Sequence, residues 1–275
     1  MSGSGSIDRP RFLWVVTGAT LAFLFAPLVV VAVFSFNSSA SLTTLDGASL
    51  RWYRAFFDDA DLLASLRLSV VIAVIASVAS VALGTLVAVG IRRGSRRVGG
   101  ATNGSVFLRV LTPETATGVA LLLLFTQLGI PLSTTTVVVS HTVLCLAFVA
   151  VVVGSRLALL NPEVEDAAMD LGATRLHAFR LVALPVLWPS IVAAGLLSFV
   201  LSFDNFITSF FTSGVGVPPL PVRIYGMLKF GVTPVVNAIG VLMLLATVLA
   251  VGLSLLLTAQ VRKLRGSRPE EVARG

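Results

Sequence analysis

The sequence alternates long apolar runs with short polar segments. A run of about 20 apolar residues is long enough to cross the hydrocarbon core of a membrane. Backbone groups in lipid must be hydrogen-bonded within the segment, so such runs are expected to be helical. Runs without a charged residue extend over Phe12–Phe34, Leu68–Ile91, Leu181–Phe203 and Phe230–Val261.

A fifth uncharged stretch, Thr115–Ser155, is too long for a single span. Gly129-Ile130-Pro131 offers a turn near its middle, and we divide it there. The pattern therefore predicts an all-α membrane protein with six transmembrane helices. The expected spans are residues 12–34, 66–91, 106–129, 134–156, 189–211 and 234–260. They form one membrane domain, residues 12–261, between an N-terminal tail, 1–11, and a C-terminal tail, 262–275.

The composition agrees with this class. Only 12% of residues are charged, about half the share typical of soluble domains, and the mean hydropathy is +0.97.

The net charge of +7 is unevenly distributed along the chain. Basic residues gather after the second, fourth and sixth spans, for example at Arg92, Arg93, Arg156 and Arg262. Cytoplasmic loops carry such an excess, so the pattern places both termini in the cytoplasm. The arginines are divided among loop ends without interleaved aromatic residues, which argues against a nucleic-acid partner.

The polar segment EDAAMDLGATRLHAFRLVALP, residues 165–185, interrupts the apolar sequence. Asn161 and Pro162 are suited to begin a short helix, and Gly172 to end it. Thr174 can cap a second helix, which Leu184-Pro185 is expected to end. Spacing alone leaves two interpretations open: a helix pair lying on the membrane, or a projection that inserts into a partner's groove.

The same segment resembles the EAA loop of ABC-importer permeases. Asp166-Ala167-Ala168, Gly172 and Leu184-Pro185 occupy the motif positions, with Asp166 in place of the usual Glu. The resemblance implies the six-helix type I importer permease architecture. It also implies that loop 157–188, including Phe179 of the second helix, is a cytoplasmic coupling loop that docks into an ATPase subunit. ATP and Mg would then bind to that partner, because this chain has no phosphate-binding loop.

A closer resemblance extends over most of the chain. RWYRAFF, TPETATGVALLLLF, LSFDNFITSFFTSG and LPVRIYGMLKFGVTPVVNAIGVLML are similar to segments of the smaller, second type of spermidine/putrescine permease. The resemblance implies a multi-pass protein of the bacterial inner membrane. Its implied partners are a second permease, two ATP-binding subunits and an extracytoplasmic solute-binding protein.

Two acids are predicted within the spans, where a charge costs roughly 2.5–3.5 kcal/mol on insertion scales. Glu114 follows Pro113, and it either lines a pathway or pairs with Arg109 at the interface. Asp204 either meets a cationic solute or bonds to a neighbouring helix. By resemblance to the polyamine permeases, Glu114 and Asp204 line the route, and Asn205 departs from a second acid. The predicted substrate pathway comprises Trp52, Glu114, Ser202, Asp204 and Asn205.

Other features are expected to be structural. Trp52 also fits an aromatic belt at the outer interface, and His141 and Cys145 are expected to be packed side chains. No known catalytic motif or metal-ligand set is present, so we predict a transport subunit without a catalytic site. The alternatives are a permease for another small solute, or an ion-coupled carrier or membrane enzyme that acts without an ATPase.

Overall fold

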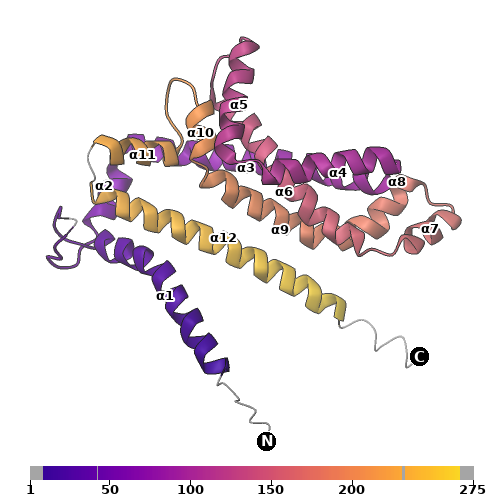
Figure 1. The fold of residues 1–275 in the computed structure, drawn as a ribbon, viewed down its shortest axis with the longest axis horizontal. Helices are drawn as coiled ribbons and strands as arrows, with labels where there is room; N and C mark the ends of the chain where they lie inside the picture. The colour runs from indigo at the N-terminus through magenta and orange to yellow at the C-terminus, as the bar shows by residue number, and fades with distance from the viewer. Residues whose placement is uncertain (1–8, 42, 231–232, 267–275) are drawn as a thin grey trace, which may run out of the picture. The chain divides into compact units, whose positions relative to one another are not determined.

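The computed structural model describes residues 9–41, 43–230 and 233–266. The ends of the predicted tails, residues 1–8 and 267–275, lie outside these ranges. The described residues form helices, connecting loops and one isolated β-bridge between Asn37 and Ala48 (Figure 1). The helices are α1 (Arg9–Ser35), α2 (Arg51–Asp58), α3 (Ala60–Arg93), α4 (Arg96–Leu111), α5 (Glu114–Gln127), α6 (Thr134–Ala158), α7 (Pro162–Asp170), α8 (Arg175–Ala178), η1 (Phe179–Ala183), α9 (Leu184–Phe203), α10 (Ile207–Thr212), α11 (Leu220–Phe230) and α12 (Val235–Gly266).

Within the described ranges, five helices are long and apolar enough to cross a membrane, and the bent pair α4–α5 would make a sixth. α1, α3, α6 and α12 lie where spans were predicted, although α3 begins at Ala60 rather than near residue 66. The turn predicted at Gly129-Ile130-Pro131 is confirmed, and Gly129 has a φ of +66°. The all-helical membrane fold is therefore confirmed.

The third predicted span, residues 106–129, is not one straight helix. α4 ends at Leu111, α5 begins at Glu114, and the two helices are bent by 108°. Thr112 adopts an extended conformation, with φ −70° and ψ 129°. The residue before a proline is pushed toward this region, so Pro113 accounts for the break.

The fifth predicted span, residues 189–211, has different limits. A continuous helix runs from Arg175 to Phe203. The prediction that Leu184-Pro185 ends the second loop helix was wrong. A π-helical turn, η1, leads directly into α9, and Pro185 is the second residue of α9. Local π-helical adjustments let a helix continue past a proline in a membrane segment.

The chain divides into two compact units, which we describe separately. The first draws on Met1–Ala60 and Gly226–Leu244, and the second on Asp61–Tyr225 and Leu245–Gly275. In the first unit, buried Asn37 organises the loop between α1 and α2. Its side-chain amide donates to the carbonyl oxygens of Ser41 (3.0 Å) and Thr44 (2.7 Å), and its Oδ1 accepts from the N–H of Asp46 (2.9 Å).

In the second unit, α3, α6 and α9 share a core, and α4 packs against α6 (Figure 1). The main cluster comprises Ala88, Val149, Val153, Leu157, Ala183, Leu187, Ile191 and Ala194. α3 and α6 approach closely at Gly84, where an added Cβ would lie 2.7 Å from the Cβ of Val149. This core joins the π-helical turn directly to the long helices.

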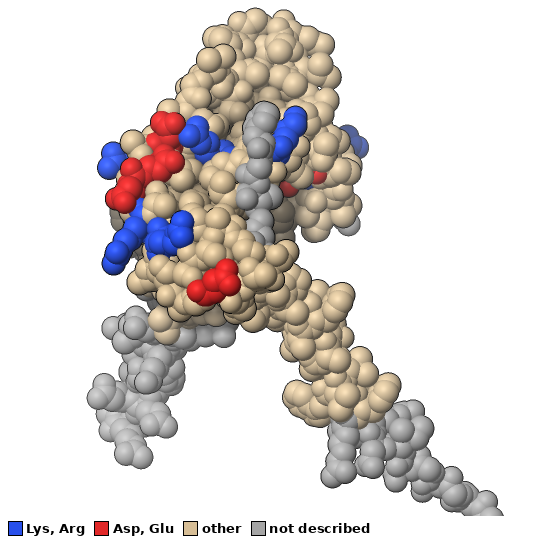
Figure 2. All heavy atoms as spheres, turned by 90° about the vertical axis from the view of Figure 1, so that its left-hand side faces the viewer, with Lys and Arg blue, Asp and Glu red and all other residues tan. Residues whose placement is uncertain are grey.

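Large apolar side chains remain on the surface of the chain. Trp14 and Phe23 of α1, for example, are 76% and 80% exposed. On the face shown in Figure 2, charged side chains gather in a few groups and long stretches of helix surface carry none. Exposed apolar area of this extent indicates contact with lipid or other subunits.

Candidate functional site

In the polar loop between α6 and α9, both helices begin where the sequence predicts, although the second continues into α9. The side chain of Asn161 accepts a hydrogen bond from the N–H of Glu163 at 3.1 Å and so caps α7. The first turn carries Glu163 and Glu165, where acids complement the positive end of the helix dipole. Thr174 Oγ1 caps α8 by accepting from the N–H of His177 at 3.3 Å.

Gly172 makes the turn between the two loop helices. Its φ is +91°, a conformation that L side chains rarely adopt. The N–H of Ala173 donates to the carbonyl of Ala168 (3.0 Å), and the N–H of Gly172 donates to that of Met169 (2.9 Å). This pair of bonds is the Schellman arrangement that ends a helix. Next to it, Leu171 is 90% exposed.

The motif residues divide between the exposed and the packed side of the loop. Asp166 and Ala167 are exposed, whereas Ala168 is half-buried. Phe179 and Leu184 pack against the main core cluster. The loop therefore presents one face to its surroundings and rests the other on the long helices.

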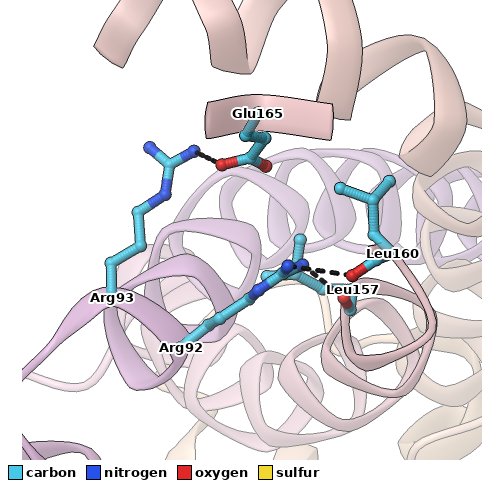
Figure 3. A network of polar contacts seen from close by, with 5 residues as sticks. All are labelled: Arg92, Arg93, Leu157, Leu160 and Glu165. Carbon is cyan, nitrogen blue, oxygen red and sulfur yellow. Dashed lines mark hydrogen bonds and ion pairs between the residues drawn. The ribbon is translucent and has the colours of Figure 1, made fainter. Parts of the chain in front are cut away.

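Two arginines at the end of α3 attach the loop to that helix (Figure 3). The Arg92 guanidinium donates to the carbonyl oxygens of Leu157 and of Leu160, the latter at 3.0 Å. Arg93 forms an ion pair with Glu165 of α7 at 2.6 Å. The Arg93 guanidinium also lies over the Phe179 ring, 5.3 Å from its centroid.

Sequence reasoning assigned Arg92 and Arg93 only to the basic residues that orient the chain. Their contacts cross more than 60 positions of sequence, and no local pattern signals them.

A cavity of about 620 Å³ lies in the second unit beside the break between α9 and α10. Its lining includes three of the predicted pathway residues, Glu114, Asp204 and Asn205. The α4–α5 bend contributes Arg109 and Thr112, and α6 contributes Leu144 and Phe148. The breaks between α4 and α5 and between α9 and α10 thus bring polar groups together at this cavity.

Asn205 and Thr208 hold the Glu114 carboxylate. The Asn205 side-chain amide and the Thr208 hydroxyl, the latter at 3.3 Å, donate to Glu114 Oε1. Asn205 Oδ1 also accepts from the N–H of Thr208, in the first turn of α10, at 3.0 Å. The alternative pairing of Glu114 with Arg109 is not seen as a direct ion pair. The carboxylate is instead fixed by neutral donors.

Asp204 occupies the C-cap position of α9 and is exposed in this chain. The sequence had placed it inside a continuous helix. Thr247 Oγ1 of α12 donates to Asp204 Oδ2 at 3.1 Å. Nε and Nη2 of Arg109, on the same cavity wall, are buried without a hydrogen-bond partner. The cavity therefore holds two carboxylates and one guanidinium.

Residues 80–264 match the family described as binding-protein-dependent transport system inner membrane component. The matched residues include the loop and the whole lining of the cavity. The chain belongs to this family of membrane permeases.

Related proteins resemble this permease along nearly its whole length. It is 37% identical to the putrescine transport system permease protein PotI of Escherichia coli (strain K12), covering 96% of each chain. It is 34% identical to the spermidine/putrescine transport system permease protein PotC of Haemophilus influenzae, covering 91% of this chain and 96% of the relative.

Solved structures share its fold. A bacterial ABC transporter that imports the acidic polysaccharide alginate aligns with a TM-score of 0.69 at 14% identity, covering 94% of this chain and 97% of that one. The MetNI methionine ABC transporter aligns with a TM-score of 0.63 at 19% identity, covering 73% and 95%. The permease therefore has the architecture predicted for a type I ABC importer.

His141 of the permease spans the break between α9 and α10. Its Nδ1 lies 2.7 Å from Ser202 Oγ and its Nε2 lies 3.0 Å from Ser209 Oγ. Both serines and the imidazole are buried. The expectation that His141 is a packed side chain is confirmed. Ser202, predicted in the pathway, is thus a buried partner of His141 and does not line the cavity.

Trp52 lies in α2 of the first unit, outside the residues matched to the family. Its indole N–H donates to the Asn37 carbonyl at 2.8 Å, and the Arg51 guanidinium lies 4.2 Å from the centre of its ring. These contacts fix the indole locally.

Two aromatic residues of the cavity were missed by sequence reasoning. Phe148 and Phe206 both line it. The Phe206 ring also packs against Tyr225, with centroids 4.8 Å apart. Aromatic faces attract cations, so these rings extend what the cavity can bind. Their signal in the sequence was weak, because the chain contains 17 phenylalanines.

Proposed function

We propose that this permease forms one wall of the translocation pathway of an ATP-driven importer for polyamines such as putrescine and spermidine. The observation that carries the proposal is the 37% identity to a putrescine permease over 96% of both chains. The cavity supports it through its chemistry. The Glu114 and Asp204 carboxylates can accept hydrogen bonds from ammonium groups, and Phe148 and Phe206 offer aromatic faces to the same cations.

A second permease subunit would close the cavity, because in this chain Asp204 is exposed. The carboxylates of Glu114 and Asp204 outnumber the single guanidinium of Arg109, which gives the cavity a net negative charge. A diamine that enters would replace the charge compensation that water supplies in the empty pathway. Neutral Asn205 holds Glu114 without neutralising it.

Two ATP-binding subunits, which bind ATP and Mg, would supply the driving force. The loop at 157–188 would dock into them through the exposed side that carries Asp166 and Leu171. An extracytoplasmic binding protein would deliver the solute. One structural neighbour is an alginate ABC transporter in complex with a solute-bound periplasmic protein. The distribution of arginines supports cytoplasmic termini.

Uptake of radiolabelled putrescine and spermidine into vesicles that contain the reconstituted complex tests the substrate class. We expect saturable uptake that unlabelled diamines displace and neutral diols of equal length do not. If the complex transports another solute and neither polyamine, the substrate assignment is wrong while the permease assignment stands.

A further inference from the structure

The end of α3 holds both sides of the coupling loop. Arg93 forms an ion pair with Glu165 of α7 on one side (Figure 3). On the other side its guanidinium lies over the ring of Phe179, the first residue of the π-helical turn. The Glu165 side chain is only 13% exposed and that of Arg93 34% exposed, so water screens this ion pair incompletely. Glu165 Oε2 is bonded to Arg93, while Oε1 is buried without a hydrogen-bond partner.

Arg92 extends the same attachment to α6. A helix ends with carbonyl groups that lack partners, and cationic donors there are favourable. Arg92 donates to the carbonyl of Leu157 in the last turn of α6 and to that of Leu160 just beyond it. Leu157 also belongs to the core cluster shared by α3, α6, η1 and α9.

We propose that Arg93, Glu165 and Phe179 form a latch that carries displacement of the docked loop to α3. α7 also packs against α8 and η1, and the latch adds a direct link from α7 to the end of α3. With it, α7 and the π-helical turn must move together with α3, and through Arg92 with α6. Arg93 is thus a positioning residue for transport, acting through Glu165 and not on the solute. The inference rests on the proposed docking of this loop to ATP-binding subunits.

The test compares ATP hydrolysis and solute uptake in the complete complex, reconstituted in vesicles. Arg93→Gln and Glu165→Gln should each assemble and hydrolyse ATP, but the solute moved per ATP should fall about tenfold, the effect expected for loss of one charge-assisted hydrogen bond. The double variant Arg93→Glu with Glu165→Arg restores opposite charges and should recover most of this ratio. Arg97→Gln is the matched control, because it removes an exposed arginine near the same helix end; its ratio should remain that of the wild type.

A wild-type ratio in both single variants would overturn the latch, as would a charge exchange that recovers nothing. Should Arg93→Gln fail to assemble, cysteines at positions 93 and 165 joined by a short bis-maleimide provide a second measurement. The joined complex should still transport, because the latch stays closed as the loop moves. Loss of transport on joining would contradict the proposal. If wild type itself shows no ATP-dependent uptake, the proposed function fails, which is distinct from failure of the latch alone.

Discussion

At the residue scale, polar groups in this permease gather where apolar helices are interrupted. Asp204 and Asn205 follow the end of α9, and Glu114 begins α5 after the proline break. An acid within a continuous helix would need a partner in lipid, whereas at these breaks it meets a cavity. The breaks therefore make the acids tolerable and place them together.

Replacing Asp204 with Asn should lower polyamine uptake about tenfold, the effect of losing one charge-assisted contact with an ammonium group. Assembly should survive, because the side chain keeps its shape. Thr247→Val separates the two roles of Asp204. It removes the hydrogen bond from Thr247 but keeps the carboxylate, and should transport nearly as well as wild type. Equal losses in both variants would assign Asp204 a structural role.

His141→Ala should destabilise the complex by about 1 kcal/mol or more for each lost interhelical hydrogen bond. The change leaves the Ser202 and Ser209 hydroxyls without their partner on either side of the helix break. Thermal unfolding of the purified complex measures the effect. Thr142→Val is a suitable control, because that hydroxyl donates to the carbonyl of Val138 within the same helix. Similar melting temperatures in His141→Ala and wild type would show that His141 does not stabilise the packing around the break between α9 and α10.

The sequence predicted individual residues well where the signal is local. Asn161 and Thr174 cap their helices through residues at most four positions away, and Gly172 adopts a positive φ because it has no side chain. It could not predict the contacts of Arg93 or Thr247, which depend on the packing of distant helices. Candidate acids can thus be found from sequence, but not their partners.

At the element scale, the loop helices depend on a single left-handed turn. Gly172→Val should strain that turn by about 1–3 kcal/mol, because a β-branched residue resists a positive φ. The chain should insert normally, and ATP-driven uptake should be lost through poor docking. Gly172→Asn should retain most uptake, since Asn tolerates this conformation. Normal transport by the valine variant would show that the loop is not the coupling element.

Proline affected the elements in two ways that the sequence alone did not distinguish. Pro113 bends the predicted third span by 108°, whereas Pro185 lies within a continuous helix, shortly after its π-helical turn. The difference arises from the preceding residues, which are extended at Thr112 and π-helical before Leu184. Apolar periodicity carries no information about this choice, because it does not report the backbone conformation of the residue before a proline.

At the scale of the whole molecule, the arginine distribution predicts orientation. A cysteine introduced at Arg97 should not react with an impermeant maleimide added from outside, whereas one at Val215, which is fully exposed, should. Native Cys145 is buried and contributes little background labelling. Labelling at position 97 but not at 215 in intact cells would reverse the assigned topology.

We propose that this permease transports solute only as part of an ATP-driven complex. The most direct measurement is putrescine accumulation in vesicles with and without the ATP-binding subunits, the second permease and ATP. We predict accumulation only when all of them and the binding protein are present, with no uptake by this chain alone. Accumulation by the isolated chain, driven by an ion gradient in the absence of ATP, would contradict the claim.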